Sequence, residues 1–237
     1  MRYDELGAPH LATTGNIKLD LPAPPVEEGK LAQIRARIAG RPVIAAASTH
    51  PGEEAVILDV HRRLRHSFPG LLTLIAPRHP ERGAGIVDIA NVAGVNALMR
   101  SRAQLPDAGT DVYVADTIGE LGLIYRLAPI VFIGGSLVRH GGQNPIEAAK
   151  LGAAILHGPH VWNFADIYDE LDHARGAELV TDASKLAARI GVWLTDPGAR
   201  QAAADAAAET VKVLGGALDR TLAALEPYLM QLRLEQR

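Results

Sequence analysis

Short apolar segments alternate with longer amphipathic segments from Pro42 almost to the C-terminus. Several of the apolar segments have no polar position between apolar ones, which is typical of strands whose sheet is covered on both faces. The pattern predicts strands at residues 43–47, 71–76, 96–99, 111–114, 130–133, 153–156 and 178–181.

The amphipathic segments between these strands predict helices. Strand followed by helix, repeated along the chain, predicts an α/β fold with a Rossmann-like, doubly wound parallel sheet. The tail is rich in alanine and carries leucines at three- and four-residue spacing, so we expect two C-terminal closing helices separated by Gly215 and Gly216. The other helices are expected at residues 52–66, 81–94, 118–127, 145–151, 164–174 and 184–194.

The first thirty residues follow neither pattern, and Pro22, Pro24 and Pro25 lie close together within them. Proline fixes the backbone and removes a hydrogen-bond donor, so this segment is predicted to be a linker or an excursion at the edge of the domain. We therefore divide the chain into a link at residues 1–30 and one domain at residues 31–237.

Composition narrows the function classes. The 237 residues carry a net charge of −3, which does not favour a nucleic-acid partner. The absence of cysteine excludes disulfides, thiolate metal sites and cysteine nucleophiles, and fits a reducing compartment. No apolar run reaches the roughly 18 residues that span a bilayer, and the N-terminus lacks a secretory pattern. We expect a cytosolic, soluble chain.

The nine histidines show no spacing typical of a metal site. We expect them to be solvated, and we expect neither a metal nor a cofactor.

The residues most suggestive of chemistry follow predicted strands, because ligands of doubly wound sheets gather where the strands end. The richest segment, residues 132–147, has a glycine pair at the end of a strand and another before a helix. Asn144 is a candidate N-cap, with Pro145 in the first turn and Glu147 three residues after the cap. Glycines and a helix start would let a phosphate reach main-chain N–H groups. A capping box and an ordinary turn explain the same residues without a ligand.

Four other junctions have unusual composition. At residues 75–82, Arg78 and His79 lie between prolines and suit a phosphate or a base edge, or form a surface turn with solvated Arg78 and Arg82. At residues 46–54, hydroxyls and a histidine precede a helix with an acidic first turn, which ordinary capping also explains. Thr117 and Glu120 have the spacing of a capping box, and residues 158–164 either add Asn163 to the same rim or only turn the chain.

Six segments at these junctions follow one another along the chain. They are Ser-Thr-His-x-Gly-Glu-Glu at 48–54, Ala-Pro-Arg-His-Pro-Glu-Arg at 76–82, Ala-Asp-Thr-Ile-Gly-Glu-Leu at 115–121, Ile-Gly-Gly-Ser-Leu-Val at 133–138, Gly-Gly-Gln-Asn-Pro-Ile-Glu at 141–147 and Gly-Pro-His-x-x-Asn-Phe at 158–164. Together and in this order they resemble one family, the 3-deoxy-D-manno-octulosonic acid (Kdo) transferases of lipopolysaccharide biosynthesis. The opening Thr14-Gly15-Asn16-Ile17-Lys18 also resembles the segment that joins the two domains of that family.

The resemblance implies the C-terminal, donor-binding half of a GT-B glycosyltransferase. Such enzymes take Kdo from CMP-Kdo and add it to a lipid A precursor at the cytoplasmic face of the inner membrane, inverting and without a metal. The likeness places Pro77, Arg78 and His79 on the cytidine monophosphate and Glu147 on the ribose. By the same likeness, the phosphate would lie against Gly134, Gly135, Ser136, Gly142, Gln143 and Asn144, with further contacts from Ser48, Thr49, His50, Gly119 and Asn163.

The family also has an N-terminal acceptor domain, with a membrane anchor and a glutamate that acts as base, and we find no equivalent of these in the sequence. No catalytic base is identified here, so we expect the chain to be inactive alone. Two other functions fit the same pattern. One is a UDP-sugar transferase or epimerase domain of this architecture, and the other is a non-catalytic nucleotide- or partner-binding domain.

Overall fold

The protein is described by a computed structural model, which covers residues 5–8 and 10–235. Its centre is a seven-stranded sheet with the order β3-β4-β2-β1-β5-β6-β7, in which every neighbouring pair is parallel. The predicted fold class is therefore confirmed. The strands are β1 (Val43–Thr49), β2 (Leu72–Pro77), β3 (Ala97–Met99), β4 (Val112–Val114), β5 (Ile130–Ile133), β6 (Ala154–His157) and β7 (Ala177–Leu179).

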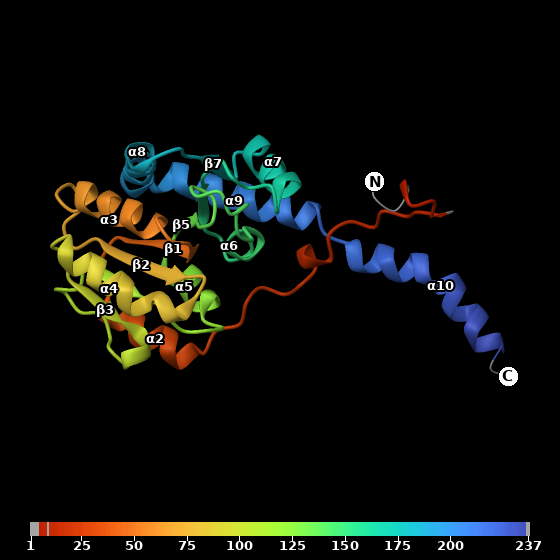
Figure 1. Cartoon of the computed structure of the whole chain (residues 1–237), viewed down its shortest axis with the longest axis horizontal. Coiled ribbons are helices and arrows are strands. Elements are labelled where there is room, and N and C mark those ends of the chain that lie inside the picture. Colours follow the sequence, from red (N-terminus) through yellow and green to blue (C-terminus); the bar gives the residue numbers. More distant parts are fainter. Residues whose placement is uncertain (1–4, 9, 236–237) are drawn as a thin grey trace. The chain divides into compact units, whose positions relative to one another are not determined.

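Helices follow the strands and cover both faces of the sheet (Figure 1). The α-helices are α2 (Glu28–Arg37), α3 (Glu53–Leu64), α4 (Gly83–Val92), α5 (Leu121–Leu127), α6 (Ile146–Lys150), α7 (Ala165–His173), α8 (Ala183–Thr195), α9 (Pro197–Val213) and α10 (Ala217–Glu235). Three short 3₁₀ turns are η1 (Ile17–Leu19), η2 (Pro80–Arg82) and η3 (Arg100–Arg102).

Alternate residues of the central strands point to opposite faces of the sheet. Ile44 and Ala46 of β1 point to the face that is covered by α3, α4 and α8. Helix α3 buries Ile57, Val60 and Leu64 there, which are three and four residues apart and share one side of the helix. On the other face, α5 packs against β1 and β2, and α2 packs against α5. Both faces of the strands are buried, as their uninterrupted apolar character predicted.

Helix α2 was not predicted, because the prolines before it suggested a link. Its apolar positions Leu31, Ile34 and Ile38 are all buried and follow helical spacing. The boundary that we expected at residue 30 falls inside this helix. Strand β7 ends earlier than predicted, at Leu179, and the chain then enters α8, whose first turn the Asp182 side chain caps.

The chain forms two compact units. Residues 23–210 hold the whole sheet, and residues 1–22 with 211–237 form the other unit. Within the latter, the Asp20 carboxylate accepts N–H bonds from Gly216 and Leu218, both at 2.6 Å, and so caps the start of α10.

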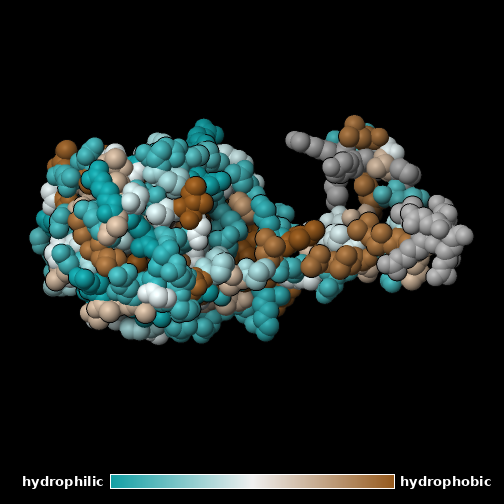
Figure 2. All heavy atoms as spheres, turned by 90° about the horizontal axis from the view of Figure 1, so that it is seen from below, coloured by the Kyte–Doolittle hydropathy of each residue, from teal (hydrophilic) through white to brown (hydrophobic). Residues whose placement is uncertain are grey.

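The two closing helices, α9 and α10, are confirmed, with the break at residues 214–216. Four leucines of α10 between residues 218 and 229 lie on one side of the helix, where each is about half exposed. Brown atoms form an apolar stripe along this part of the chain in Figure 2. No helix in the described ranges is both long and apolar enough to cross a membrane. The four leucines are Leu218, Leu222, Leu225 and Leu229.

Candidate functional site

The candidate site lies at the edge where the parallel strands end, which we call the carboxyl edge. The chain passes from β1 to β2 on one side, and β5 pairs with β1 on the other side. Strand order therefore reverses at β1, and such a reversal is where open α/β sheets bind ligands. The loops that follow β1, β2, β4 and β5 all meet at this edge.

A cavity of about 380 Å³ opens among the loops after β1, β2 and β4. We call it the arginine pocket, because Arg78 lines it with an exposed side chain beside His79. Its volume lies in the range that small-molecule ligands occupy. The lining residues are Ser48, Ala76, Pro77, Arg78, His79, Pro80, Glu81, Ala115, Thr117, Ile118, Gly119, Glu120, Leu121 and Ile124.

The end of β1 is distorted where it borders this pocket. Ser48 has φ of 57°, in the left-handed region, and the pairing of β1 with β2 shifts register there. Residues other than glycine enter that region rarely, and such strain concentrates at functional sites. The next residue, Thr49, accepts the main-chain N–H of Arg78 at 3.0 Å, which fixes the start of the arginine loop.

The main-chain N–H groups of the first glycine pair are bonded within the protein, an arrangement that does not favour the phosphate contact expected of them. The N–H of Gly134 donates to Ala47 at 2.8 Å. The N–H groups of Gly135 and Ser136 donate to the buried carboxylate of Glu53 at 2.7 and 3.0 Å. The protein thus supplies its own anion where we expected a phosphate, so these amides are not available to cradle one.

In the second glycine pair, Gly142 also bonds within the protein, as does Gln143 after it. Gly142 and Gln143 donate their N–H groups to the carbonyls of Gly135 and Gly134, at 2.8 and 3.0 Å. A Cβ on Gly134 would lie 2.5 Å from the Ser48 carbonyl oxygen, so this glycine lets the ends of β1 and β5 approach each other. The glycines in residues 134–144, the glycine loop, therefore serve packing between loops.

The start of α6 also differs from the prediction. Pro145 is the N-cap, and the Asn144 side chain accepts the N–H of Ile146 at 3.0 Å from one position earlier. Glu147 is half-buried, and burial raises the pKa of its carboxyl. Neither Asn144 nor Glu147 lines the arginine pocket.

His50 joins the arginine pocket to the glycine loop. Its ring lies 6.1 Å from that of His79 and 3.7 Å from that of His140, centroid to centroid. Its Nε2 lies 3.0 Å from the Gln143 amide nitrogen. Burial, and then the neighbouring histidines and Arg82, lower the pKa of His50 to about 4, so the ring is neutral at pH 7.

The expectation that the histidines are solvated is wrong for three of them, because His50, His61 and His157 are buried. The His61 ring bonds to the Thr73 hydroxyl at 2.9 Å. The His157 ring lies 3.0 Å from the Asp172 carboxylate. Each of the His61 and His157 rings thus has a polar partner on a neighbouring element, although the Nε2 of His61 is buried without a hydrogen bond.

We expect stability to fall in mild acid. Burial lowers the folded-state pKa of both His50 and His61 below the ordinary 6.5, so the unfolded chain binds protons more readily. The contribution of His50 is complete above about pH 6.5 and is lost as the pH falls toward 4, and that of His61 is lost in the same direction. The free energy of unfolding should decrease by about 1–2 kcal/mol between pH 7 and pH 5, with allowance for solvent screening. Urea denaturation at both pH values measures this, and His50→Gln should reduce the difference; an equal loss in that variant would contradict the assignment.

Asn163 is exposed and fastens the glycine loop. Its side-chain amide donates to the carbonyl of His140 at 3.1 Å, and its main-chain N–H donates to Gly141 at 2.9 Å. For residues 158–164 we considered a ligand contact from Asn163 and a simple turn of the chain. The hydrogen bonds of Asn163 to the glycine loop favour the turn.

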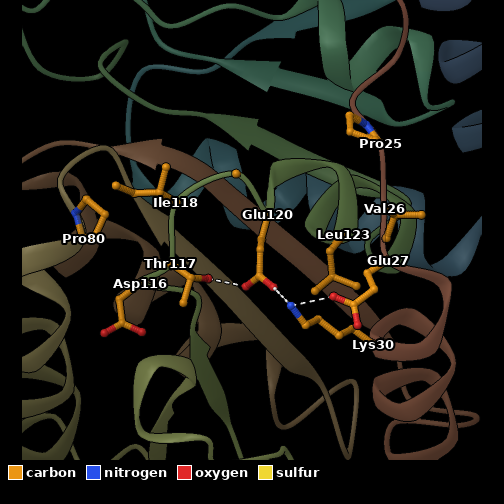
Figure 3. A pocket seen from close by; sticks show the side chains of 11 residues that line it. Pro25, Val26, Glu27, Lys30, Pro80, Asp116, Thr117, Ile118, Glu120 and Leu123 are labelled. Atoms are coloured by element: carbon orange, nitrogen blue, oxygen red, sulfur yellow. Dashed lines mark hydrogen bonds and ion pairs between the residues drawn. The ribbon is translucent and has the colours of Figure 1, made fainter.

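A second cavity of about 860 Å³ lies against the same β4–α5 loop (Figure 3). We call it the outer pocket. It shares Pro80 and the segment 117–120 with the arginine pocket, so this segment is a wall common to both. Pro25, Val26, Glu27, Lys30, Asp116 and Leu123 complete its lining.

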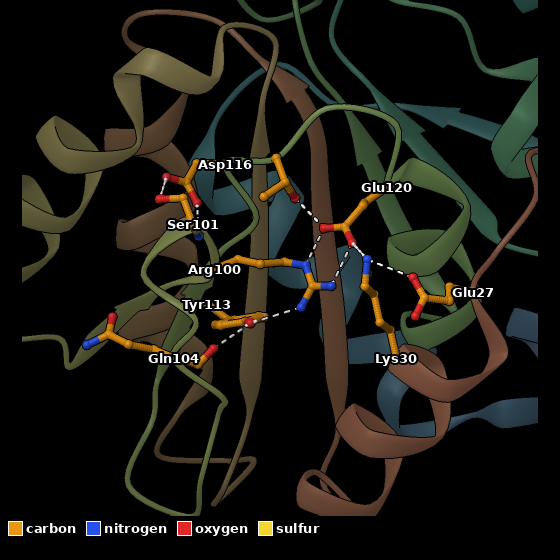
Figure 4. A network of polar contacts seen from close by, with 9 residues as sticks. Glu27, Lys30, Arg100, Ser101, Gln104, Tyr113, Asp116 and Glu120 are labelled. Carbon is orange, nitrogen blue, oxygen red and sulfur yellow. Dashed lines mark hydrogen bonds and ion pairs between the residues drawn. The ribbon is translucent and has the colours of Figure 1, made fainter.

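An ion-pair network holds this wall in place (Figure 4). The Glu120 carboxylate pairs with the Arg100 guanidinium, with an Nη2–Oε1 distance of 2.6 Å, and also accepts the Thr117 hydroxyl. Lys30 approaches the same carboxylate at 3.5 Å. These bonds, that with Arg100 above all, lower the pKa of Glu120 to about 2. The capping box that we considered for Thr117 and Glu120 is not formed, because Glu120 is itself the N-cap of α5 and binds Arg100.

The structure divides the predicted site residues into two groups. Ser48, Pro77, Arg78, His79 and Gly119 line the arginine pocket. The remainder belong to the β1 loop, the glycine loop, α6 and the 158–164 turn, outside that lining. Sequence reasoning did not assign Ile118, Leu121 and Ile124 to the site, although they line the pocket. It also gave no site role to Glu53 and Glu54, which are buried.

Within the described chain, no group of three or more histidine, aspartate or glutamate side chains is placed to hold a metal ion.

No protein-family model matches the chain, but curated proteins do. It is 38% identical over 232 residues to the 3-deoxy-D-manno-octulosonic acid transferase of Haemophilus influenzae, covering 96% of this chain and 54% of that protein. It is 36% identical, with the same coverage, to the 3-deoxy-D-manno-octulosonic acid transferase of Bordetella pertussis. The chain thus spans about half the length of these relatives.

A solved structure matches the fold and the sequence together. The C-terminal CMP-Kdo binding domain of WaaA from Acinetobacter baumannii superposes with a TM-score of 0.73 at 32% identity. The match covers 77% of this chain and 96% of that domain. The chain therefore matches nearly all of that separate C-terminal domain.

Proposed function

Because the chain belongs to the Kdo transferase family of glycosyltransferases, we propose that it binds the donor CMP-Kdo, with the CMP in the arginine pocket. The arginine pocket itself carries this proposal. It lies at the carboxyl edge of a parallel sheet, it is large enough for a nucleotide, and it has a guanidinium at its rim.

Each part of the pocket suits one part of the ligand. The Arg78 guanidinium offers planar, paired donors that match a phosphate. The apolar side chains of Ile118, Leu121 and Ile124 offer contact area to a base or ribose. Since the glycine-loop amides are engaged by Glu53, side chains rather than main-chain N–H groups bind the phosphate in this proposal.

The chemistry follows from the leaving group. Breaking the bond between the anomeric carbon of the sugar and the phosphate oxygen leaves negative charge on the departing CMP. A fixed guanidinium stabilises that charge as it develops. In the proposal, the sugar is transferred to a lipid A precursor with inversion and without a metal, at the cytoplasmic face of the inner membrane. The base that activates the acceptor hydroxyl comes from the N-terminal half of a full-length enzyme, so this chain alone is inactive.

Isothermal titration calorimetry with CMP and UDP tests the donor assignment. We expect CMP to bind and UDP to bind at least roughly tenfold more weakly, a difference of about 1.4 kcal/mol. Cytidine, which lacks the phosphate, serves as the control for the arginine contact and should also bind more weakly than CMP. Tighter binding of UDP would favour a UDP-sugar enzyme, and no binding of CMP would refute the proposal.

A further inference from the structure

We propose that Glu53 and Glu54, the first two residues of α3, are positioning residues that hold the two loops beside the donor site. The inference rests on the function proposed above. Both carboxylates are buried, with 0% and 1% exposure, although neither touches the arginine pocket. Buried carboxylates are costly unless they are fully bonded, so the contacts that these two make indicate what they do.

Glu53 holds the glycine loop against the loop after β1. Its Oε2 accepts the N–H groups of His50 and Gly135, at 2.9 and 2.7 Å. Its Oε1 accepts those of Ser136 and Leu137, both at 3.0 Å. One side chain thus fixes three successive amides of a loop that is more than eighty residues away in the sequence. The partial positive charge at the start of α3 also favours the carboxylate.

Glu54 holds the arginine loop from the other side. It forms a two-pronged ion pair with Arg82 of η2, at 2.7 and 2.9 Å, and accepts the Thr49 hydroxyl at 2.7 Å. Arg82 also donates to the Thr49 carbonyl at 3.3 Å. That carbonyl accepts the N–H of Arg78. The pair therefore ties both ends of segment 78–82 to the end of β1.

Glu53 therefore holds the glycine loop, and its neighbour Glu54 holds the arginine loop. Adjacent positions in the first turn of a helix point about 100° apart, which lets consecutive side chains reach toward β5 and toward β2. Since α3 follows β1 directly, the helix start is the common anchor of both loops. The spacing between Arg78 and the His50–Gln143 contact depends on this anchor.

Replacing each glutamate by glutamine keeps the side-chain volume and tests the roles of Glu53 and Glu54 separately. For Glu53→Gln, we expect hydrogen exchange of the Gly135, Ser136 and Leu137 amides to become at least roughly tenfold faster, because a charge-assisted acceptor is lost. For Glu54→Gln, we expect those amides to stay protected and CMP affinity to fall roughly tenfold, with less than about a threefold change for cytidine. A purely structural role would not change the ratio of CMP to cytidine affinity.

Asp59→Asn is the matched control, because it changes a carboxylate to an amide on the exposed side of the same helix. It should leave both measurements unchanged. Arg82→Lys weakens the same ion pair from its other, partly exposed partner. This variant should also lower the ratio of CMP to cytidine affinity. Unchanged loop protection in Glu53→Gln, or unchanged CMP affinity in both Glu54→Gln and Arg82→Lys, would overturn the inference. Failure of the wild-type chain to bind CMP would instead refute the proposed function.

Discussion

Replacing Arg78 by alanine is expected to weaken CMP binding by ten- to a hundredfold. Hydrogen bonds to charged groups contribute about 1.5–3 kcal/mol each, and Arg78 is the exposed guanidinium of the arginine pocket. Its main chain is fixed by the N–H bond to Thr49, so truncation of the side chain should leave the loop in place. Calorimetric titration of the variant with CMP measures the effect.

Two controls separate a phosphate contact from a general loss of structure. Cytidine should bind the wild type and Arg78→Ala with affinities within about threefold of each other, because the nucleoside has no phosphate for Arg78 to contact. Arg62→Ala removes an exposed guanidinium from α3 outside the pocket lining and should bind CMP like the wild type. Equal CMP affinity in Arg78→Ala and the wild type would show that Arg78 does not contact the bound nucleotide.

Gly134→Ala is expected to destabilise the protein by about 2–3 kcal/mol, a fall in Tm of roughly 5–10 °C. The new Cβ would lie 2.5 Å from the Ser48 carbonyl oxygen and 2.6 Å from the Thr49 Cα, both main-chain atoms. Relief of this overlap must separate the ends of β1 and β5. Because that separation moves the β1 loop, CMP affinity should fall together with stability. Thermal denaturation followed by circular dichroism measures the first effect.

Gly85→Ala provides the matched glycine control. Gly85 lies inside α4 with an exposed position, and a Cβ there would meet no atom within 4 Å. Alanine has a better helix propensity than glycine by up to about 1 kcal/mol, so this variant should be as stable as the wild type or slightly more stable. A Gly134→Ala protein as stable as Gly85→Ala would show that close approach of the two strands is not required.

The pattern of apolar segments was sufficient to predict the sheet. Residues 43–47 of β1 and all of β5 are apolar, and an uninterrupted apolar segment of this length is typical of a strand that is buried on both faces. Helix α2 was missed because its helical spacing of buried residues, Leu31, Ile34 and Ile38, follows directly on a proline-rich segment. A proline restricts only itself and the residue before it, so the apolar spacing after residue 30 was the better predictor of a helix.

The candidate site was harder to predict, because local patterns do not show which partner satisfies a polar group. The glycine pair at residues 134–135 does mark a close main-chain approach, but the approach is to β1 and to Glu53. For the acidic first turn formed by Glu53 and Glu54, ordinary helix capping and a ligand site were both left open, since such a turn is common. Their burial depends on loops distant in sequence, which only the fold brings together. Two adjacent acidic residues after a buried strand were the available signal.

Mapping of CMP onto the protein by amide chemical shifts tests the central claim, that the nucleotide binds in the arginine pocket. With increasing CMP, the account predicts that the largest amide shifts occur at Arg78, His79, Glu81 and residues 117–121, on both walls of that pocket. The amides of Val26, Glu27 and Lys30, which border only the outer pocket, should change little. Shifts concentrated in that outer segment, or no shifts at saturating CMP, would contradict it.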